Sequence, residues 1–171
     1  QSILSMRHLL LCLLTFSLLT TCRQAPQIDY SAEKTGTFTK AAIASPHPKV
    51  TEVGLKVLKN GGNAIDAAVA MQFAMAVVYP RAGNIGGGGF LVYRDKDGKS
   101  EALDYRERAP AAASRDMYLD EEGNVIPKLS TLGHRAVGVP GTVAGIEAMH
   151  KKHGSKPWDE LVGYAISLAE N

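Results

Sequence analysis

Apolar residues recur with the period of an α-helix in four stretches of the chain, and we expect a helix in each. In the first, apolar positions 50, 53, 57 and 58 share one face, and Gly61 supplies the end. The second stretch follows Asn63, a preferred capping residue, and runs over residues 64–78. The other two expected helices cover residues 142–153 and 157–171.

Strand-like patterns occur in three further places. Residues 40–45 form a short apolar run ending at Pro46, which predicts a buried strand that leads into a turn. Residues 88–94 and 100–108 are typical of strands, and the polar turn 95–98 between them predicts a hairpin. Helices packed on strands indicate a layered domain, with parallel and antiparallel arrangements both open.

The expected helix over residues 64–78 is apolar nearly all round. A membrane-spanning helix needs roughly 20 apolar residues, so we interpret this one as buried inside a layered domain. Asp66 lies in its first turn, where the helix dipole favours a carboxylate that is hydrogen-bonded on the cap side.

Four consecutive glycines, residues 86–89, lead directly into the expected strand. A Walker loop ends in Gly-Lys-Ser/Thr and a dinucleotide fingerprint leads into a helix, so neither nucleotide-binding motif fits. Glycines beside a strand are costly in backbone entropy and mark a close approach of backbone to backbone or ligand. We therefore predict a structural role, allowing tight packing beneath a site.

The first residues have the pattern of an export signal, with Met6 as the expected start. Arg7-His8 precede an apolar stretch over residues 9–19, and Leu19-Thr-Thr-Cys22 resembles a bacterial lipobox, although Thr21 departs from it. We expect a signal peptide over 1–22, lipidation of Cys22, a tether over 23–39 and the folded portion over 40–171. The protein would be exported to the periplasm or cell envelope; an ordinary cleaved signal with a neutral cysteine is the alternative.

Charge and cysteine content exclude several classes of protein. The chain has 19 Lys and Arg residues, and loss of Arg7 with the leader leaves 18 against 17 Asp and Glu. This balance offers no clustered basic face for nucleic acid. The other cysteine, Cys12, lies in the leader, so residues 23–171 hold no disulfide pair and no Cys and His cluster for a metal.

Several motifs together resemble the amino-terminal part of the γ-glutamyltranspeptidase (glutathione hydrolase) family. They are Ala44-Ser-Pro-His-Pro48, Gly61-Gly-Asn-Ala-Ile-Asp-Ala-Ala68, the glycine run, Leu103-Asp-Tyr-Arg-Glu-Arg-Ala-Pro110, Ala136-Val-Gly-Val-Pro-Gly-Thr-Val-Ala-Gly145 and Pro157-Trp158. The resemblance implies an α+β fold, the opening part of the four-layer αββα sandwich of N-terminal-nucleophile hydrolases. It also implies that the chain is a fragment of the large subunit of a bacterial precursor.

Arg106 is the candidate substrate-binding residue. A guanidinium fork next to a close-packed glycine run can bind a carboxylate through two parallel hydrogen bonds. The alternative is an exposed ion pair of Arg106 with Asp104 or Glu107, which is a common arrangement. In the resemblance, Arg106 matches the arginine that binds the α-carboxylate of the γ-glutamyl donor, whereas Glu107 and Arg108 carry no such role.

The resemblance further implies γ-glutamyl transfer or hydrolysis after autocatalytic cleavage of the precursor, with no cofactor or metal. The donor would be glutathione or a related γ-glutamyl compound, and the acceptor water, an amino acid or a dipeptide. The catalytic threonine would begin the small subunit, beyond Asn171, so neither Thr131 nor Thr142 takes its place. Alternatives are a glutaryl-cephalosporin-type acylase and a catalytically dead, surface-tethered binding protein.

The histidines are assigned no catalytic role. His47, between two prolines, is expected to be a structural hydrogen-bond donor. His134, His150 and His153 lack the spacing of a metal triad, and the last two are expected to face solvent.

Overall fold

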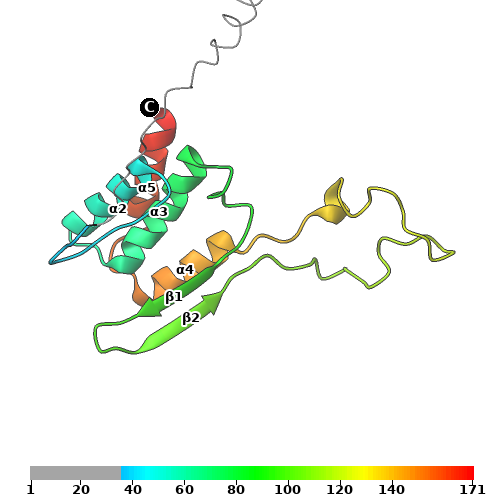
Figure 1. Ribbon diagram of the computed structural model, residues 1–171, viewed down its shortest axis with the longest axis horizontal. Coiled ribbons are helices and arrows are strands. Elements are labelled where there is room, and N and C mark those ends of the chain that lie inside the picture. Colours follow the sequence, from blue (N-terminus) through cyan, green and yellow to red (C-terminus); the bar gives the residue numbers. More distant parts are fainter. Residues whose placement is uncertain (1–35) are drawn as a thin grey trace, which may run out of the picture. The chain divides into compact units, whose positions relative to one another are not determined.

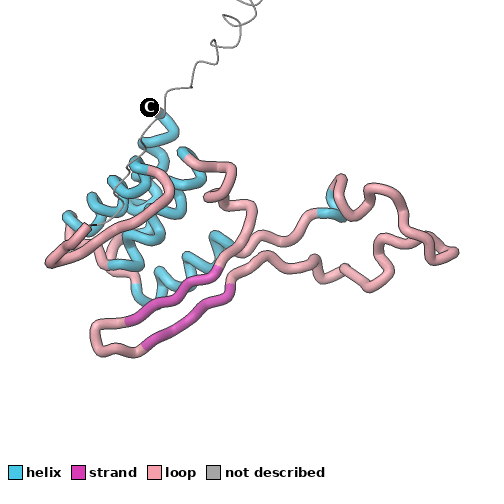
Figure 2. The backbone as a smooth tube through the Cα atoms, in the orientation of Figure 1, coloured by secondary structure: helices cyan, strands magenta, loops and turns pink. Residues whose placement is uncertain are grey.

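The computed structural model describes residues 36–171, of which Phe38–Asn171 form one unit (Figure 1). The expected signal peptide, Cys22 and most of the tether lie outside the described residues. Within the described part, the regular elements are four α-helices, one short 3-10 helix and two strands, and Figure 2 distinguishes helix from strand by colour. No helix among residues 36–171 is long and apolar enough to cross a bilayer.

Helix α2 (Pro48–Lys59) confirms the first expected helix. It buries Val50, Val53 and Val57, and Gly61, with φ of 81°, follows its end. His47 precedes the helix, and its Nδ1 accepts a hydrogen bond from the Lys49 N–H at 3.3 Å. The ring accepts here because the first turn of a helix presents unpaired N–H groups that need an acceptor. A neutral imidazole that accepts at Nδ1 carries its proton on Nε2, so the expected donor role stays a prediction.

Helix α3 (Ala64–Val78) lies at the centre of the packing, against α2, α4 and α5. A reciprocal capping box begins it: Asn63 Oδ1 accepts from the Asp66 N–H at 3.0 Å, and Asp66 Oδ2 accepts from the Asn63 N–H at 2.8 Å. Ala67, Val69, Ala70 and Ala74 are buried along it. The buried helix and the cap-side carboxylate are both confirmed.

Strands β1 (Phe90–Arg94) and β2 (Ser100–Asp104) form the expected antiparallel hairpin, with Val92 opposite Ala102. Gly98 adopts φ of 84° in the turn. The second strand ends four residues earlier than expected. Beyond it Arg108 exchanges two backbone hydrogen bonds with Val139 rather than with the glycine run, so the change of partner ends the hairpin ladder.

The expected strand over residues 40–45 was wrong. These residues are mostly exposed and form no ladder, since among residues 36–171 only β1 and β2 make a sheet. A strand needs a neighbouring backbone to pair with, and local apolar pattern cannot supply one. Ile43 nevertheless packs against the buried core.

Helices α4 (Thr142–His153) and α5 (Trp158–Glu170) confirm the last two expected helices. In α5 the Trp158 ring meets Phe73 of α3 edge-on, with centroids 5.5 Å apart. Figure 1 shows α4 lying along the hairpin, while α2, α3 and α5 group together. Leu91, Tyr93 and Leu103 of the hairpin pack against the buried core. A loop with one short 3-10 turn, η1 (His134–Ala136), connects the hairpin to α4.

Candidate functional site

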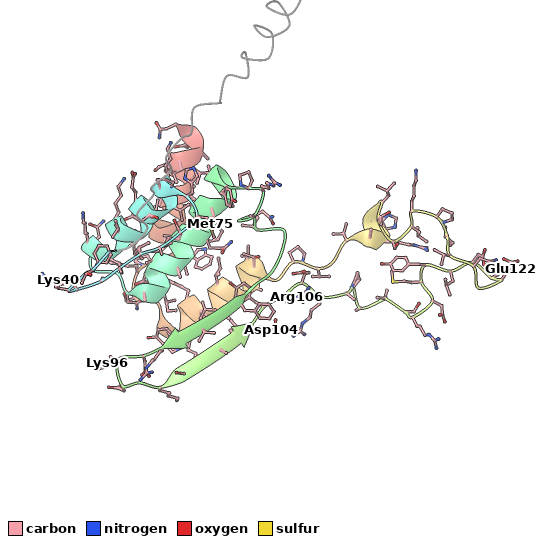
Figure 3. The ribbon with its side chains drawn as sticks, viewed as in Figure 1. Lys40, Met75, Lys96, Asp104, Arg106 and Glu122 are labelled. Carbon is pink, nitrogen blue, oxygen red and sulfur yellow. The ribbon has the colours of Figure 1, made fainter. Side chains whose placement is uncertain are left out.

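Arg106 lies two residues beyond the end of β2, where the chain enters the long loop (Figure 3). Asp104 shapes this exit, because its Oδ1 accepts a hydrogen bond from the Arg106 N–H at 3.0 Å. The alternation of the strand persists this far: Leu103 and Tyr105 are half-buried, whereas Asp104 and Arg106 are exposed. The Arg106 side chain is 67% exposed and so is open to a ligand.

A groove of about 320 Å³ runs between the end of the hairpin and α4. Arg106 and Arg108 both line it. Its remaining lining is mostly apolar and comes from the end of β2, the residues just after it, the segment before α4 and the N-terminal part of α4. It includes Leu103, Tyr105, Val139, Ala144 and Ala148. The arrangement suits a ligand that carries a carboxylate beside an aliphatic part.

The glycine run packs against the segment that carries Arg106. A Cβ added to Gly88 would lie 2.5 Å from the Glu107 N and 2.6 Å from the Arg106 Cα, closer than side chains allow. Gly87 contributes its carbonyl, which accepts hydrogen bonds from the Gly141 and Thr142 N–H groups at 2.8 and 3.1 Å and so caps α4. The predicted close approach is confirmed at Gly88, and the run also fastens the start of α4.

The acidic side chains near Arg106 belong to its neighbours in sequence, Asp104 and Glu107. Its Nε lies 3.7 Å from Glu107 Oε1, and the two side chains are 67% and 44% exposed. Exposed ion pairs of this kind contribute little, about 0–1 kcal/mol. The Asp104 carboxylate bonds the Arg106 backbone rather than its side chain. A carboxylate ligand would therefore compete only with the weak Glu107 ion pair for the Arg106 guanidinium.

A second charged cluster, which the sequence did not reveal, joins the hairpin to the end of α4. Glu101 of β2 accepts hydrogen bonds from Lys152 Nζ at 2.6 Å and from His153 Nε2 at 3.1 Å. These bonds, from Lys152 first and His153 second, hold the pKa of the Glu101 carboxyl below its ordinary value. The cluster fastens the turn end of the hairpin, away from Arg106.

The expectation that His150 and His153 face solvent was wrong. His153 is 23% exposed and stacks on Tyr93 with ring centroids 4.6 Å apart. The His150 ring bonds the Lys156 carbonyl at 2.8 Å and lies against Trp158. Helical spacing places His150 and His153 on one face of α4 but does not show what packs against that face. The structure supplies those neighbours from β1 and from the connection between α4 and α5.

Other candidate residues lie apart from the groove. Thr131 is exposed in the long loop, and Thr142 is buried at the start of α4. His134 lies in η1 and is exposed. Within residues 36–171, no group of His, Cys, Asp and Glu side chains is arranged to hold a metal ion.

The model of the family described as Gamma-glutamyltranspeptidase matches residues 50–171 of this chain. Two relatives are the glutathione hydrolase proenzymes of Pseudomonas sp. strain A14 and Escherichia coli K12, which are 53% and 46% identical over 146 and 151 residues. The alignments cover 85% and 86% of this chain but 24% and 26% of those proteins. The chain thus spans about a quarter of the length of these relatives.

The solved structure of Helicobacter pylori gamma-glutamyltranspeptidase is similar, with a TM-score of 0.73 and 56% identity. The match covers 79% of this chain and 39% of that one. It confirms the expected fold class, the α+β fold of the N-terminal-nucleophile hydrolases. The sequence match over most of the chain and this structural likeness together establish that the chain belongs to the gamma-glutamyltranspeptidase family.

Proposed function

We propose that this chain is the opening part of the large subunit of a glutathione hydrolase precursor, and that Arg106 binds the α-carboxylate of the γ-glutamyl donor. The observation that carries the proposal is the exposed Arg106 fork, held at the end of β2 beside an apolar groove. A γ-glutamyl group has the matching chemistry, because its α-carboxylate is separated from the scissile amide by an aliphatic chain.

The reaction we propose is acyl transfer. After autocatalytic cleavage of the precursor, the hydroxyl of a threonine beyond Asn171 attacks the γ-glutamyl amide carbonyl, and the free α-amino group of that threonine accepts the proton. The amine leaves with a proton, and a γ-glutamyl ester remains on the enzyme. Water, or the amino group of an amino acid or peptide, then takes the acyl group and restores the hydroxyl. Arg106 acts by orienting the donor.

The complete precursor tests this proposal against the two alternatives. We expect it to be cleaved into two subunits and to hydrolyse a γ-glutamyl anilide faster than a glutaryl anilide, which lacks the α-carboxylate and α-amino groups. Faster cleavage of the glutaryl compound would indicate an acylase instead. An uncleaved chain that binds γ-glutamyl compounds without turnover would indicate a dead binding protein.

We propose in addition that the protein is exported and anchored by lipid on Cys22. The support is the short apolar stretch over residues 9–19 and the lipobox-like Leu19-Thr-Thr-Cys22. We expect Cys22→Ser to abolish labelling by a radioactive fatty acid and to release the protein from the membrane fraction. The matched control is Cys12→Ser, which lies in the leader and should leave labelling intact. Unchanged labelling of Cys22→Ser would show an ordinary cleaved signal.

A further inference from the structure

The Tyr105 ring is enclosed by glycines from two segments that are far apart in sequence. A Cβ on Gly89 would lie 2.8 Å from Tyr105 Cε2, and a Cβ on Gly145 of α4 would overlap Tyr105 Cγ and Cβ. Side-chain Cβ atoms essentially never come within 3.0 Å of another heavy atom in this way. The ring therefore occupies space that exists only because both positions are glycine.

The backbone of Tyr105 is held by the same two segments. Its N–H donates to the Gly89 carbonyl at 3.0 Å, and its carbonyl lies against the Cα of Gly141, where a Cβ would overlap it. Gly141 in turn donates to the Gly87 carbonyl. The glycine run, residue 105 and the start of α4 thus form one interlocked unit immediately before Arg106.

The Arg106 side chain, unlike its backbone, has little to hold it in place. Its side chain is 67% exposed, and its ion pair with Glu107 spans 3.7 Å. Holding a long side chain in one geometry costs conformational entropy, and a misplacement of about 1 Å costs much of the benefit of a positioned group. The guanidinium can therefore be placed only through the Arg106 backbone, which Asp104, Gly88 and the adjoining Tyr105 hold.

We propose that Tyr105 is a positioning residue for Arg106: its ring, seated between Gly89 and Gly145, sets where the guanidinium meets the donor carboxylate. This inference rests on the proposed function of Arg106. Gly145 faces the Cβ, Cγ and Cδ1 atoms of Tyr105, and Gly89 faces its Cε2, Cζ and hydroxyl oxygen. Most of these contacts are made by ring carbons, so we expect the ring rather than the hydroxyl to set the position.

Gly145→Ala in the complete precursor tests the proposal without touching Tyr105 or Arg106. The added methyl group must displace the Tyr105 ring, so we expect kcat/KM for a γ-glutamyl anilide to fall by about tenfold, mainly through KM, with precursor cleavage preserved. The matched control is Gly163→Ala on α5, another helical glycine, where an added Cβ meets nothing within 4 Å. This variant should keep wild-type kinetics.

A double-mutant cycle shows whether Tyr105 acts through Arg106. We expect Tyr105→Ala to lower kcat/KM by about tenfold alone, but by less than about twofold when added to Arg106→Ala. Tyr105→Phe, which keeps the ring, should have the kcat/KM of the wild type. Equal losses in both backgrounds, or a loss of precursor cleavage in both Tyr105→Ala and Gly145→Ala, would overturn the assignment.

The outcomes also separate this inference from the proposed function. A large loss in Arg106→Ala with normal kinetics in Gly145→Ala and Tyr105→Ala would leave Arg106 as the anchor and overturn only the role of Tyr105. Normal kinetics in Arg106→Ala would overturn the proposed anchor itself, and the role of Tyr105 with it.

Discussion

Arg106→Ala in the complete precursor is expected to lower kcat/KM for a γ-glutamyl anilide by well over tenfold. A hydrogen bond to a charged group contributes about 1.5–3 kcal/mol, the bidentate fork makes two of them, and about 1.4 kcal/mol corresponds to a factor of ten. Arg106→Lys should lower kcat/KM by about tenfold or more, because lysine lacks the planar fork. This loss should be smaller than that of Arg106→Ala, because lysine keeps the charge. Steady-state kinetics on purified enzyme measures both losses.

Precursor cleavage should survive both Arg106 substitutions, since the scissile bond of the precursor carries no free donor carboxylate. A gel of the purified protein checks this beside the kinetics. Arg115→Ala provides the matched control, because Arg115 also lies in the loop after β2, is 96% exposed and does not line the groove. Near-normal kinetics in Arg106→Ala would show an arginine that merely pairs with Glu107. Joint loss of cleavage and activity would mark a structural residue.

The second large effect is expected at Asp66, which is fully buried at the start of α3. Its carboxylate accepts from the Asn63 N–H at 2.8 Å, the Ser155 N–H at 2.9 Å, the Ser155 hydroxyl at 2.6 Å and the Lys156 N–H at 3.2 Å. Asp66 therefore joins the cap of α3 to the connection between α4 and α5. Asp66→Ala leaves these donors without their acceptor.

We expect Asp66→Ala to lower the free energy of unfolding by on the order of 3 kcal/mol, because each buried group left unpaired costs about 1–3 kcal/mol and water reaches some of these donors. Thermal unfolding of the purified mature enzyme measures the change. Asp116→Ala is the control: Asp116 is 70% exposed, and its loss should stay within about 0.5 kcal/mol. A stability of Asp66→Ala equal to that of the control would contradict this role.

The same carboxylate predicts a dependence on pH. Burial alone would raise the Asp66 pKa, but the hydrogen bonds from Ser155, Asn63 and Lys156 outweigh it and hold the pKa below the ordinary value of 3.8. The folded state therefore binds the proton less readily than the unfolded chain, and the stabilisation is complete above about pH 4. It is lost as the pH falls through the folded pKa. The difference between wild type and Asp66→Ala should accordingly shrink in acid.

Much of the helical structure could be predicted from the sequence, because its determinants are local. Asn63 caps α3 through hydrogen bonds to N–H groups two and three residues away, and Gly61 follows the end of α2 with a positive φ. The candidate site could be predicted for a different reason, because Arg106 was identified from the family motif. Gly141, which precedes α4, and Gly145, one turn later, are spaced so that both face the same neighbour, and this spacing is a sequence signal of close backbone approach.

The sequence by itself determined the elements whose hydrogen bonds join neighbours, namely the helices and the hairpin, together with the family. The tertiary structure decided everything that depends on distant partners. Residues 40–45 form no strand because no described backbone pairs with them. Strand β2 ends at Asp104, one more bond joins Tyr105 to Gly89, and Arg108 then pairs with Val139 instead of with the glycine run. The contacts among Gly87, Tyr105 and Gly141 beside Arg106 likewise depend on tertiary packing. Residues 18 or more apart in the chain approach one another only when packing brings their backbones together, and no local pattern encodes that approach.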